Sequence, residues 1–256
     1  MATALISGAS SGLGEQFARL LAAEKYDLIL VARREDRLKS VAESAAKLGA
    51  GKVKIIASDL TGYEAAAALH KQIASENIQV DYLVNNAGFG TRGRFDNLPL
   101  AREIDEIELN VTALVALTRL FLPSMVARGS GTIINVSSVG GFTPVPFMAT
   151  YGATKAFVLS FSEALAEELR GTGVTVMALC PGATRTEFQK VANVDDARMP
   201  SFTFMDAETV VKQAIAAAKR GRSVYINGPM NLLMVESARI APRKLVARIA
   251  GAMFRE

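Results

Sequence analysis

The start of the chain joins a short apolar run to a glycine-rich turn and then to a helical pattern. The run spans Thr3–Ser7, the turn reads Gly8-Ala-Ser-Ser-Gly12-Leu-Gly14, and Phe17, Leu20 and Leu21 follow at helical spacing. In this order, glycines let the backbone approach a pyrophosphate, and the N-terminus of the following helix attracts its charge. A tight turn without a ligand is the alternative for the glycines alone, because their spacing differs from the commoner G-x-G-x-x-G.

The alternation of apolar strands and helical segments continues along the chain. Further strands are predicted at Asp27–Ala32, Lys52–Ser58, Val80–Val84, Gly131–Val136 and Val174–Cys180, with helices between them such as Arg37–Leu48, Glu103–Leu122 and Tyr151–Leu169. Continuous apolar runs are typical of parallel strands that are buried on both faces. The pattern predicts an α/β fold, a doubly wound parallel sheet with helices on both faces. The length of 256 residues fits one domain, residues 1–256.

Composition excludes several classes of function. The chain has one cysteine, Cys180, and one histidine, His70, so neither a disulfide framework nor a Cys/His metal site is expected. We expect Cys180 in the core and His70 at the surface or in packing. The net charge of +4 is modest and the basic residues are scattered except at the C-terminus, which argues against nucleic-acid binding.

The sequence also bears on the compartment. No leader pattern precedes the first strand, which predicts a cytoplasmic protein. The most apolar long stretch, Val111–Val126, contains Arg119 and Pro123, so we expect no transmembrane helix.

Two arginines, Arg33 and Arg34, follow the second predicted strand. In dinucleotide-binding folds an acidic residue about 20 positions past the glycines binds the ribose 2′-hydroxyl, whereas an arginine there accommodates a 2′-phosphate. The arginines therefore favour NADP(H) over NAD(H). The alternative is that both are solvated charges at the start of the next helix. Asp59, after the third strand, could cap a helix starting near Thr61, bind an adenine amine, or do both.

Small and polar residues follow the later strands as well. They are Asn85, Asn86, Ala87 and Gly88 after the fourth, Ser137 and Ser138 after the fifth, and Pro181, Gly182, Thr184 and Thr186 after the sixth. Open α/β sheets bind ligands at this carboxyl edge. The asparagines are expected to brace neighbouring strands with their amides. Asn110 lies in an apolar helix, where its amide needs a partner such as a helix kink or an ordered water.

Tyr151 and Lys155 are four residues apart in a predicted helix and project from the same side. A cation near a phenol favours the phenolate and lowers the pKa of the phenol toward working pH. Alternatively, Tyr151 begins an ordinary amphipathic helix and Lys155 extends to solvent, which is the commoner meaning of an isolated Tyr-x-x-x-Lys pair.

Taken together, these motifs are similar to those of the short-chain dehydrogenase/reductase family, which has a Rossmann fold. The resemblance covers about Leu5–Pro229 and depends on Gly8, Gly12, Gly14, Asn85 to Gly88, Asn110, Ser138, Tyr151, Lys155, Pro181 and Gly182. Departures are slight: Ser7 stands where threonine is frequent, and Thr184 where many members have an aliphatic residue.

The resemblance implies a catalytic set. Tyr151 is the expected general acid or base, and Ser138 polarises the substrate oxygen. Lys155 lowers the pKa of Tyr151 and binds the nicotinamide ribose, while Asn110 positions a water of a proton relay. Ser138 is preferred over Ser137 because its separation from Tyr151 matches the family.

The implied cofactor contacts come from all the strand ends. They are Gly8, Ser10, Ser11, Gly12, Leu13, Gly14, Arg33, Arg34, Asp59, Leu60, Asn86, Ala87, Gly88, Tyr151, Lys155, Pro181, Gly182, Thr184 and Thr186. The implied activity is NADP(H)-dependent interconversion of a carbonyl and a secondary alcohol, with a small-molecule substrate and no metal. Family members are usually dimers or tetramers assembled through the helices that hold Asn110 and Tyr151.

Substrate choice is expected to come from residues 186–208, a predicted lid. Phe188, Met199, Phe202, Phe204 and Met205 favour an apolar substrate, although a flap that packs on its own domain is equally compatible. A helix is expected to restart near Glu208.

The extension 230–256 ends in a basic amphipathic helix from Lys244, with Leu245, Ile249 and Met253 or Phe254 on one stripe. We expect this helix to pack on its own domain or a sister subunit, and a weak contact with an anionic membrane surface is the alternative. Two other functions remain open: a non-catalytic dinucleotide-binding regulator, and a peripheral membrane lipid-binding protein on the same fold.

Overall fold

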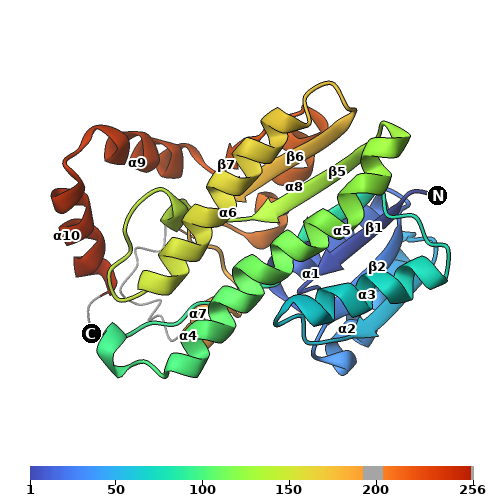
Figure 1. Cartoon of the computed structure of the whole chain (residues 1–256), viewed down its shortest axis with the longest axis horizontal. Coiled ribbons are helices and arrows are strands. Elements are labelled where there is room, and N and C mark those ends of the chain that lie inside the picture. Colours follow the sequence, from blue (N-terminus) through green and yellow to red (C-terminus); the bar gives the residue numbers. More distant parts are fainter. Residues whose placement is uncertain (193–203, 255–256) are drawn as a thin grey trace.

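A parallel sheet forms the centre of the molecule in the computed structural model, which describes residues 1–192 and 204–254 (Figure 1). Within these residues the sheet has seven strands in the order β3-β2-β1-β4-β5-β6-β7. The strands are β1 Thr3–Ser7, β2 Asp27–Ala32, β3 Val53–Ala57, β4 Tyr82–Asn85, β5 Gly131–Val136, β6 Val174–Cys180 and β7 Val224–Ile226. The order reverses between β1 and β4, which confirms the predicted doubly wound sheet.

Helices cover both faces of the sheet (Figure 1). One layer holds α1 (Gly12–Ala23), α2 (Glu35–Leu48) and α8 (Ala207–Lys219), and the other holds α3 (Tyr63–Ser75), α5 (Ala113–Arg128) and α6 (Ala149–Glu168). Successive strand residues alternate between the layers: Ala4 and Ile6 pack under the first, and Leu5 packs under the second. This double burial explains why the strands read as continuous apolar runs.

The long helix before β5 differs from its predicted bounds of Glu103–Leu122. It begins with α4 (Leu100–Ile107), passes through a π-helical turn at Glu108–Thr112 and continues as α5 to Arg128. Pro123 lies inside α5, so the helix continues past the residue where a proline would be expected to stop it. Gly129, with a φ of 68°, ends it in the left-handed conformation.

This helical stretch, Leu100–Arg128, is long and apolar enough to cross a membrane by length and composition, with a mean hydropathy of 1.6 over its most apolar window. Its inner residues Leu117, Phe121 and Met125 are buried in the layer that covers the sheet. A helix of this kind in the core of a globular protein satisfies the same criteria. We therefore interpret Leu100–Arg128 as part of the core.

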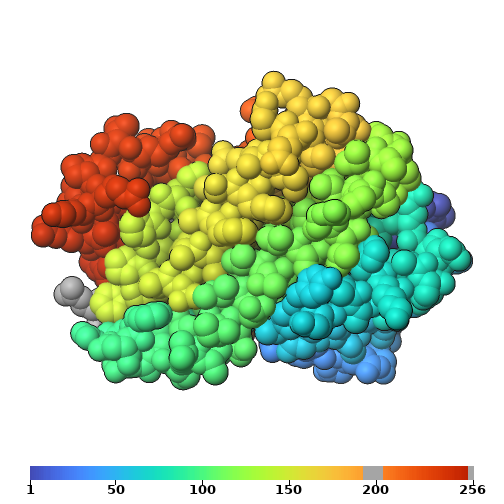
Figure 2. Space-filling view, in the orientation of Figure 1, coloured from blue at the N-terminus to red at the C-terminus, as the bar shows by residue number. Residues whose placement is uncertain are grey.

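Two helices at the C-terminal end form an arm beside the sheet, seen as the red lobe in Figure 2. They are α9 (Pro229–Ile240) and α10 (Arg243–Phe254). The stripe was expected to pack on its own domain or on a sister subunit. It does not pack on its own domain, because Leu245 and Ile249 are 50% and 57% exposed, and packing on a sister subunit stays a prediction. Instead the opposite side of α10 faces the body, because a Cβ at Gly251 would lie 3.3 Å from Pro146.

Candidate active site

A cavity of about 580 Å³ opens at the carboxyl ends of the strands. Its lining includes Gly8, Ser10, Ser11, Gly12, Leu13, Arg33, Arg34, Asp59, Leu60, Asn86, Ala87, Gly88, Ser138, Tyr151, Lys155, Pro181, Gly182, Thr184 and Thr186. The structure thus brings nearly every sequence-predicted site residue to one place. Gly14 and Asn110 do not line the cavity. Both lie behind the residues that do.

The glycine turn is shaped by backbone conformation and by close packing. Gly8 has a φ of +66°, which L side chains rarely adopt, and a Cβ there would lie 2.7 Å from the Asn86 amide. Gly14 does not line the cavity, and a Cβ on it would meet the Gly8 carbonyl oxygen at 2.2 Å, so its missing side chain lets α1 pack against the turn. The expected contact of Gly14 with the cofactor stays a prediction. Ser11, the N-cap residue of α1, makes no side-chain cap hydrogen bond, and this leaves N–H groups of the first turn available to an anion.

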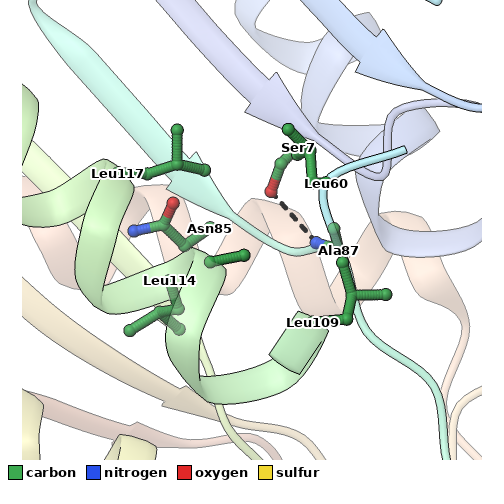
Figure 3. A pocket seen from close by; sticks show the side chains of 8 residues that line it. Ser7, Leu60, Asn85, Ala87, Leu109, Leu114 and Leu117 are labelled. Atoms are coloured by element: carbon green, nitrogen blue, oxygen red, sulfur yellow. Dashed lines mark hydrogen bonds between the residues drawn. The ribbon is translucent and has the colours of Figure 1, made fainter. Parts of the chain in front are cut away.

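Hydrogen bonds fasten the glycine turn to the end of β4. The Ser7 hydroxyl donates to the Val84 carbonyl and accepts from the Asn86 and Ala87 N–H groups at 2.9 and 3.0 Å. The side-chain amide of Asn86 donates to the carbonyls of Ser7 and Gly8. Figure 3 shows the Ser7–Ala87 bond beside a small cavity of about 10 Å³, too small for an organic ligand. The predicted bracing by asparagine is confirmed.

A second amide network lies below the floor of the cavity. Asn85 donates to Thr118 on α5 and to Asn135 on β5, each at 2.9 Å, and Asn135 donates to Ser162 on α6. All four side chains are buried. Buried amides that are paired allow only one arrangement of the elements that they join. This network therefore fixes the positions of α5 and α6 relative to β4 and β5.

The arginine pair at the end of β2 already has carboxylate partners. Arg34 donates through Nη2 to the hydroxyls of Ser10 and Ser11 and to Glu187 Oε2, the last at 2.8 Å. Arg37 Nη2 lies 3.6 Å from the other oxygen of Glu187, and the bond from Arg34 holds the pKa of Glu187 below its usual value. The turn hydroxyls and Arg34 together therefore form an anion-binding group that one carboxylate now engages.

Arg33 pairs with Asp59, with 3.7 Å between Nη1 and Oδ2. Burial raises the pKa of Asp59, but hydrogen bonds from Thr61 and the Arg33 charge outweigh it and lower that pKa. The predicted helix cap is wrong in detail: Asp59 binds the N–H and hydroxyl of Thr61, whereas α3 begins at Tyr63 with Gly62 as its N-cap. Asp59 thus stabilises the turn before the helix.

Tyr151 and Lys155 meet Ser138 where β5 ends. The Ser138 hydroxyl accepts the Gly140 N–H at 3.0 Å and lies near enough to the phenol of Tyr151 to lower its pKa. The ammonium of Lys155 donates to the Val136 carbonyl at 2.8 Å and lies 5.8 Å from the centre of the Tyr151 ring. The phenol, the hydroxyl and the ammonium all line the cavity.

The expected lowering of the Tyr151 pKa by Lys155 is not seen in the protein alone. Burial raises the pKa of Tyr151 to about 12, and the neighbouring Ser138 hydroxyl only partly opposes it. Burial also lowers the pKa of Lys155 to about 8. Both shifts favour the neutral form, because a low-dielectric site penalises charge. At neutral pH the phenol therefore holds its proton, as a proton donor must.

Asn110 lies in the π-helical turn, which fits the predicted kink. Its amide donates to the Phe89 carbonyl at 2.9 Å and to the Thr154 hydroxyl at 3.1 Å, and its oxygen accepts the Phe89 N–H. Thr154 in turn donates to the Tyr151 carbonyl. Asn110 thus ties the β4 loop to the first turns of α6, which position Tyr151.

The described part of the predicted lid contributes one aromatic side chain to the cavity. Phe188 begins α7 (Phe188–Val191) and packs on Tyr151 with 5.2 Å between ring centres. Met205 packs against the core beside α8, and Phe204 lies near Arg185. Met199 and Phe202 fall outside the described residues, so the lid and its effect on substrate choice stay predictions.

Several cavity residues had no sequence signal. Glu187 belongs to no recognisable motif, and Met230, Met234 and Ala250 reach the cavity only because the arm folds back to its rim. Other expectations held: Cys180 is fully buried, and His70 packs edge-on against Phe121 at 5.0 Å. No group of residues suited to hold a metal ion occurs within 1–192 and 204–254.

Comparison with known proteins bears on the family. A family model described as short chain dehydrogenase matches residues 2–197. The ketoacyl reductase HetN of Nostoc sp. is 39% identical over 180 residues, 70% of this chain and 62% of that protein. The very-long-chain 3-oxoacyl-CoA reductase of Bos taurus is 32% identical over 252 residues, 96% of this chain and 78% of that protein. This chain thus spans less than two thirds of the length of HetN.

One solved structure illustrates the likeness of fold. A short-chain dehydrogenase from Sphingobium yanoikuyae in complex with NADPH superposes with a TM-score of 0.83 and 36% identity. The match covers 93% of this chain and 94% of the other.

The two serines after β5 allow a first test of the site. Both serines border the cavity, but Ser137 is buried and donates to the Lys155 carbonyl at 2.7 Å, whereas Ser138 is only partly buried. Ser137→Ala is expected to lower the free energy of unfolding by about 1–3 kcal/mol, since a buried acceptor loses its donor. Ser138→Ala is expected to lower it by less, about 0.5–1 kcal/mol, since a partly buried turn loses only the cap of the Gly140 N–H. Urea unfolding of the two matched variants measures the difference, and equal losses would contradict this division of roles.

Proposed function

Because the chain belongs to the short-chain dehydrogenase family, we propose that it is an NADP(H)-dependent oxidoreductase that interconverts a carbonyl and a secondary alcohol. The observation that carries the proposal is the convergence of Tyr151, Ser138 and Lys155 on one cavity beside the glycine turn. The site also fits a dinucleotide: the turn leaves N–H groups free at the start of α1, and Arg34 with Ser10 supplies anion donors.

The chain's own residues would carry out the proton half of the reaction. In the reduction direction the Tyr151 O–H bond breaks, and its proton passes to the carbonyl oxygen, which becomes the hydroxyl of the alcohol. The Ser138 hydroxyl would orient that oxygen and stabilise its developing charge. The nicotinamide group, when bound, supplies the hydride that reaches the carbonyl carbon. The raised pKa of Tyr151 supports a phenol that stays protonated until the substrate oxygen gains charge.

Lys155 and Asn110 would support this step from behind. Lys155 is anchored by the Val136 carbonyl and keeps its other N–H bonds free for the cofactor ribose. A Cβ at Gly88 would lie 2.7 Å from Asn110 Oδ1 and 3.5 Å from Lys155 Nζ, so the backbone of the β4 loop comes close to both groups. We propose that Asn110 positions a water molecule next to Lys155 at this place. A proton would pass from solvent through that water and Lys155 to restore the proton of Tyr151.

We propose that the substrate is apolar apart from its carbonyl. Beyond Tyr151 the cavity is lined by Val145, Met148, Phe188, Met230 and Met234. Such side chains match a long or bulky hydrocarbon better than a charged one. The names of the relatives, a ketoacyl reductase and a 3-oxoacyl-CoA reductase, make 3-oxoacyl thioesters the first compounds to test.

Turnover tests the catalytic assignment. Tyr151→Phe is expected to lower kcat for NADPH-dependent reduction of an apolar 3-oxoacyl thioester or ketone about 100- to 10,000-fold, because it removes the proton donor. NADPH binding should change little. Tyr82→Phe is the matched control, since Tyr82 is a buried phenol whose hydroxyl has no partner within the described residues. Full activity in Tyr151→Phe would refute the assignment. Nucleotide binding by a wild type that turns over no substrate would instead support a regulator.

The NADP(H) preference rests on the arginines. Arg33 and Arg34 border the cavity at the end of β2, where a ribose 2′-phosphate would lie. The carboxylate of Glu187 engages Arg34 in the free protein. We propose that a 2′-phosphate takes over this partnership, so that Glu187 opposes cofactor binding and partly sets the preference.

Binding of the two nucleotides checks this assignment. Arg33→Ala and Arg34→Ala are each expected to weaken NADPH about 10-fold or more and NADH far less, since a charge-assisted hydrogen bond is worth about 1.5–3 kcal/mol. Glu187→Gln is expected to tighten NADPH binding and leave NADH nearly unchanged. Arg19→Ala, an exposed arginine on α1, is the control. Equal effects on NADPH and NADH binding would show that the arginines do not distinguish a ribose 2′-phosphate from a 2′-hydroxyl.

We further propose that the arm makes a weak, reversible contact with an anionic membrane surface, with the cytoplasm as compartment. Leu233, Ile240, Leu245 and Ile249 are exposed apolar residues on α9 and α10, with Arg243, Lys244 and Arg248 exposed among them. Basic residues interspersed with apolar ones suit a headgroup layer. For the dimer or tetramer expected from the family, we propose an interface on α5 and α6 and not on the arm, because Val126 and Phe157 are exposed there. Because Met230 and Met234 also line the cavity, an apolar substrate could enter from the membrane side.

Co-sedimentation with vesicles tests the arm. Leu245→Ser and Ile249→Ser are each expected to lower partitioning onto phosphatidylserine-containing vesicles about 5-fold, because a half-buried aliphatic side chain contributes roughly 1 kcal/mol. Vesicles of phosphatidylcholine alone should bind less protein. Leu100→Ser, exposed at the far end of α4, is the control. Equal recovery of all variants in the soluble fraction would refute the contact, and light scattering would show whether Leu245→Ser changes the oligomer instead.

A further inference from the structure

Two carboxyl groups of α4 are buried beside the proposed catalytic residues, and the mechanism above does not use them. Glu103 and Glu106 are 4% and 0% exposed. The hydroxyl of Thr91, in the loop after β4, hydrogen-bonds Glu103 Oε1 and lies 2.8 Å from Glu106 Oε2. Thr150, which precedes Tyr151 in α6, donates to the other oxygen of Glu103. The cluster therefore joins α4 to the first turn of the helix that carries Tyr151.

Counting hydrogen atoms fixes the protonation of this cluster. The Thr91 hydroxyl has one hydrogen and can donate it to one carboxylate only. Its contact with the other carboxyl group is a hydrogen bond only if that group carries a proton and donates it. Two ionised carboxylates held by one hydroxyl would also repel each other in a buried site. The geometry therefore requires one proton to be shared between Glu103 and Glu106.

The proton belongs on Glu106. Glu103 accepts from two hydroxyls and lies at the N-terminal turn of α6, where the helix dipole favours a negative charge. Glu106 Oε1 has no partner within the described residues. Burial raises the pKa of Glu106 to about 7, with the charge of Glu103 adding to the effect and Thr91 and Lys155 opposing it. Glu106 is thus neutral in slightly acidic solution and becomes an anion above neutrality.

We propose that Glu106, through the proton it shares with Glu103 and Thr91, is a positioning residue that sets the pH range in which Tyr151 can donate its proton. The inference rests on the proposed function of Tyr151. Within the described residues, the charged and titratable groups that act on Glu106 are Glu103 on its own helix and, on α6, Lys155 and Tyr151. Cys180 on β6 acts on the same two residues but stays neutral, because burial raises its pKa to about 12. The guanidinium of Arg102 is engaged 3.8 Å above the Phe89 ring.

The sign of the effect follows from charge. An anionic Glu106 disfavours the phenolate and favours the ammonium, so it raises the pKa of both Tyr151 and Lys155. As the pH rises above about 7, the loss of the Glu106 proton therefore delays the loss of the Tyr151 proton. Carbonyl reduction, which needs the protonated phenol, is extended to more alkaline pH.

The pH profile of Glu106→Gln tests the proposal. Glutamine keeps the size and can donate to Thr91, but it cannot ionise. The alkaline fall of kcat/KM for carbonyl reduction is expected to begin about one pH unit lower, and alcohol oxidation, which needs the phenolate, to rise about one unit lower. Asp105→Asn is the matched control, because Asp105 is an exposed carboxylate on the same helix. A profile of Glu106→Gln that coincides with that of Asp105→Asn would overturn the proposal.

Unfolding supplies a second readout that needs no activity. A carboxyl group whose pKa is raised from 4.5 to about 7 on folding stabilises the folded chain fully below 4.5, and this contribution is lost as the pH rises to about 7. The urea midpoint should fall across this window in the wild type and in Asp105→Asn, and fall less in Glu106→Gln. Glu103→Gln, which removes the neighbouring anion, should move the fall to lower pH.

The two readouts separate the possible failures. If the urea midpoints follow this pattern but no carbonyl compound is turned over, the shared proton stands and the proposed function fails. If the midpoints of Glu106→Gln and Asp105→Asn fall equally, the shared proton itself is refuted.

Discussion

The hydrogen bonds between Ser7 and the residues after β4 are the constraint on which the site depends. A doubly wound sheet reverses its strand order between β1 and β4. The segments that follow these two strands therefore leave toward opposite faces of the sheet. That divergence opens a crevice, but it also leaves backbone donors without sheet partners. The Ser7 hydroxyl accepts two of them, from Asn86 and Ala87, and the Asn86 amide returns two bonds to the glycine turn. The floor of the cavity is rigid because these groups satisfy each other.

Much of this arrangement could be predicted from the sequence because it depends on local rules. Continuous apolar runs specify parallel strands, and polar residues that follow such runs must gather at one edge of the sheet. Long-range packing was beyond these rules. β7 is only three residues long, α5 continues through Pro123, and the arm reaches the cavity by tertiary contacts alone. Glu187 gave no signal, since its role comes from lying opposite Arg34 and not from its neighbours in sequence.

The expectation for Tyr151 shows a limit of another kind. Spacing in a helix places Lys155 on the side of Tyr151, and this geometry is correct. Spacing does not give the dielectric around the pair, and burial moves both pKa values toward the neutral forms. The sign of a pKa shift in a buried pair is decided by the balance of desolvation and charge. Here that balance also includes Glu106, a residue on another helix that no motif identifies.

The charges of the site are compensated before any ligand arrives, and this bears on how such a site selects a nucleotide. Arg34 is matched by Glu187 and Arg33 by Asp59. An incoming 2′-phosphate would therefore replace the Glu187 carboxylate as the partner of Arg34, and it would gain only the difference between the two interactions. A 2′-hydroxyl offers no such exchange, because a neutral group cannot replace the charge of Glu187. On the proposed preference for NADP(H), selectivity would depend on how weakly Glu187 holds Arg34, and both side chains are 40% exposed or more, where ion pairs are weak.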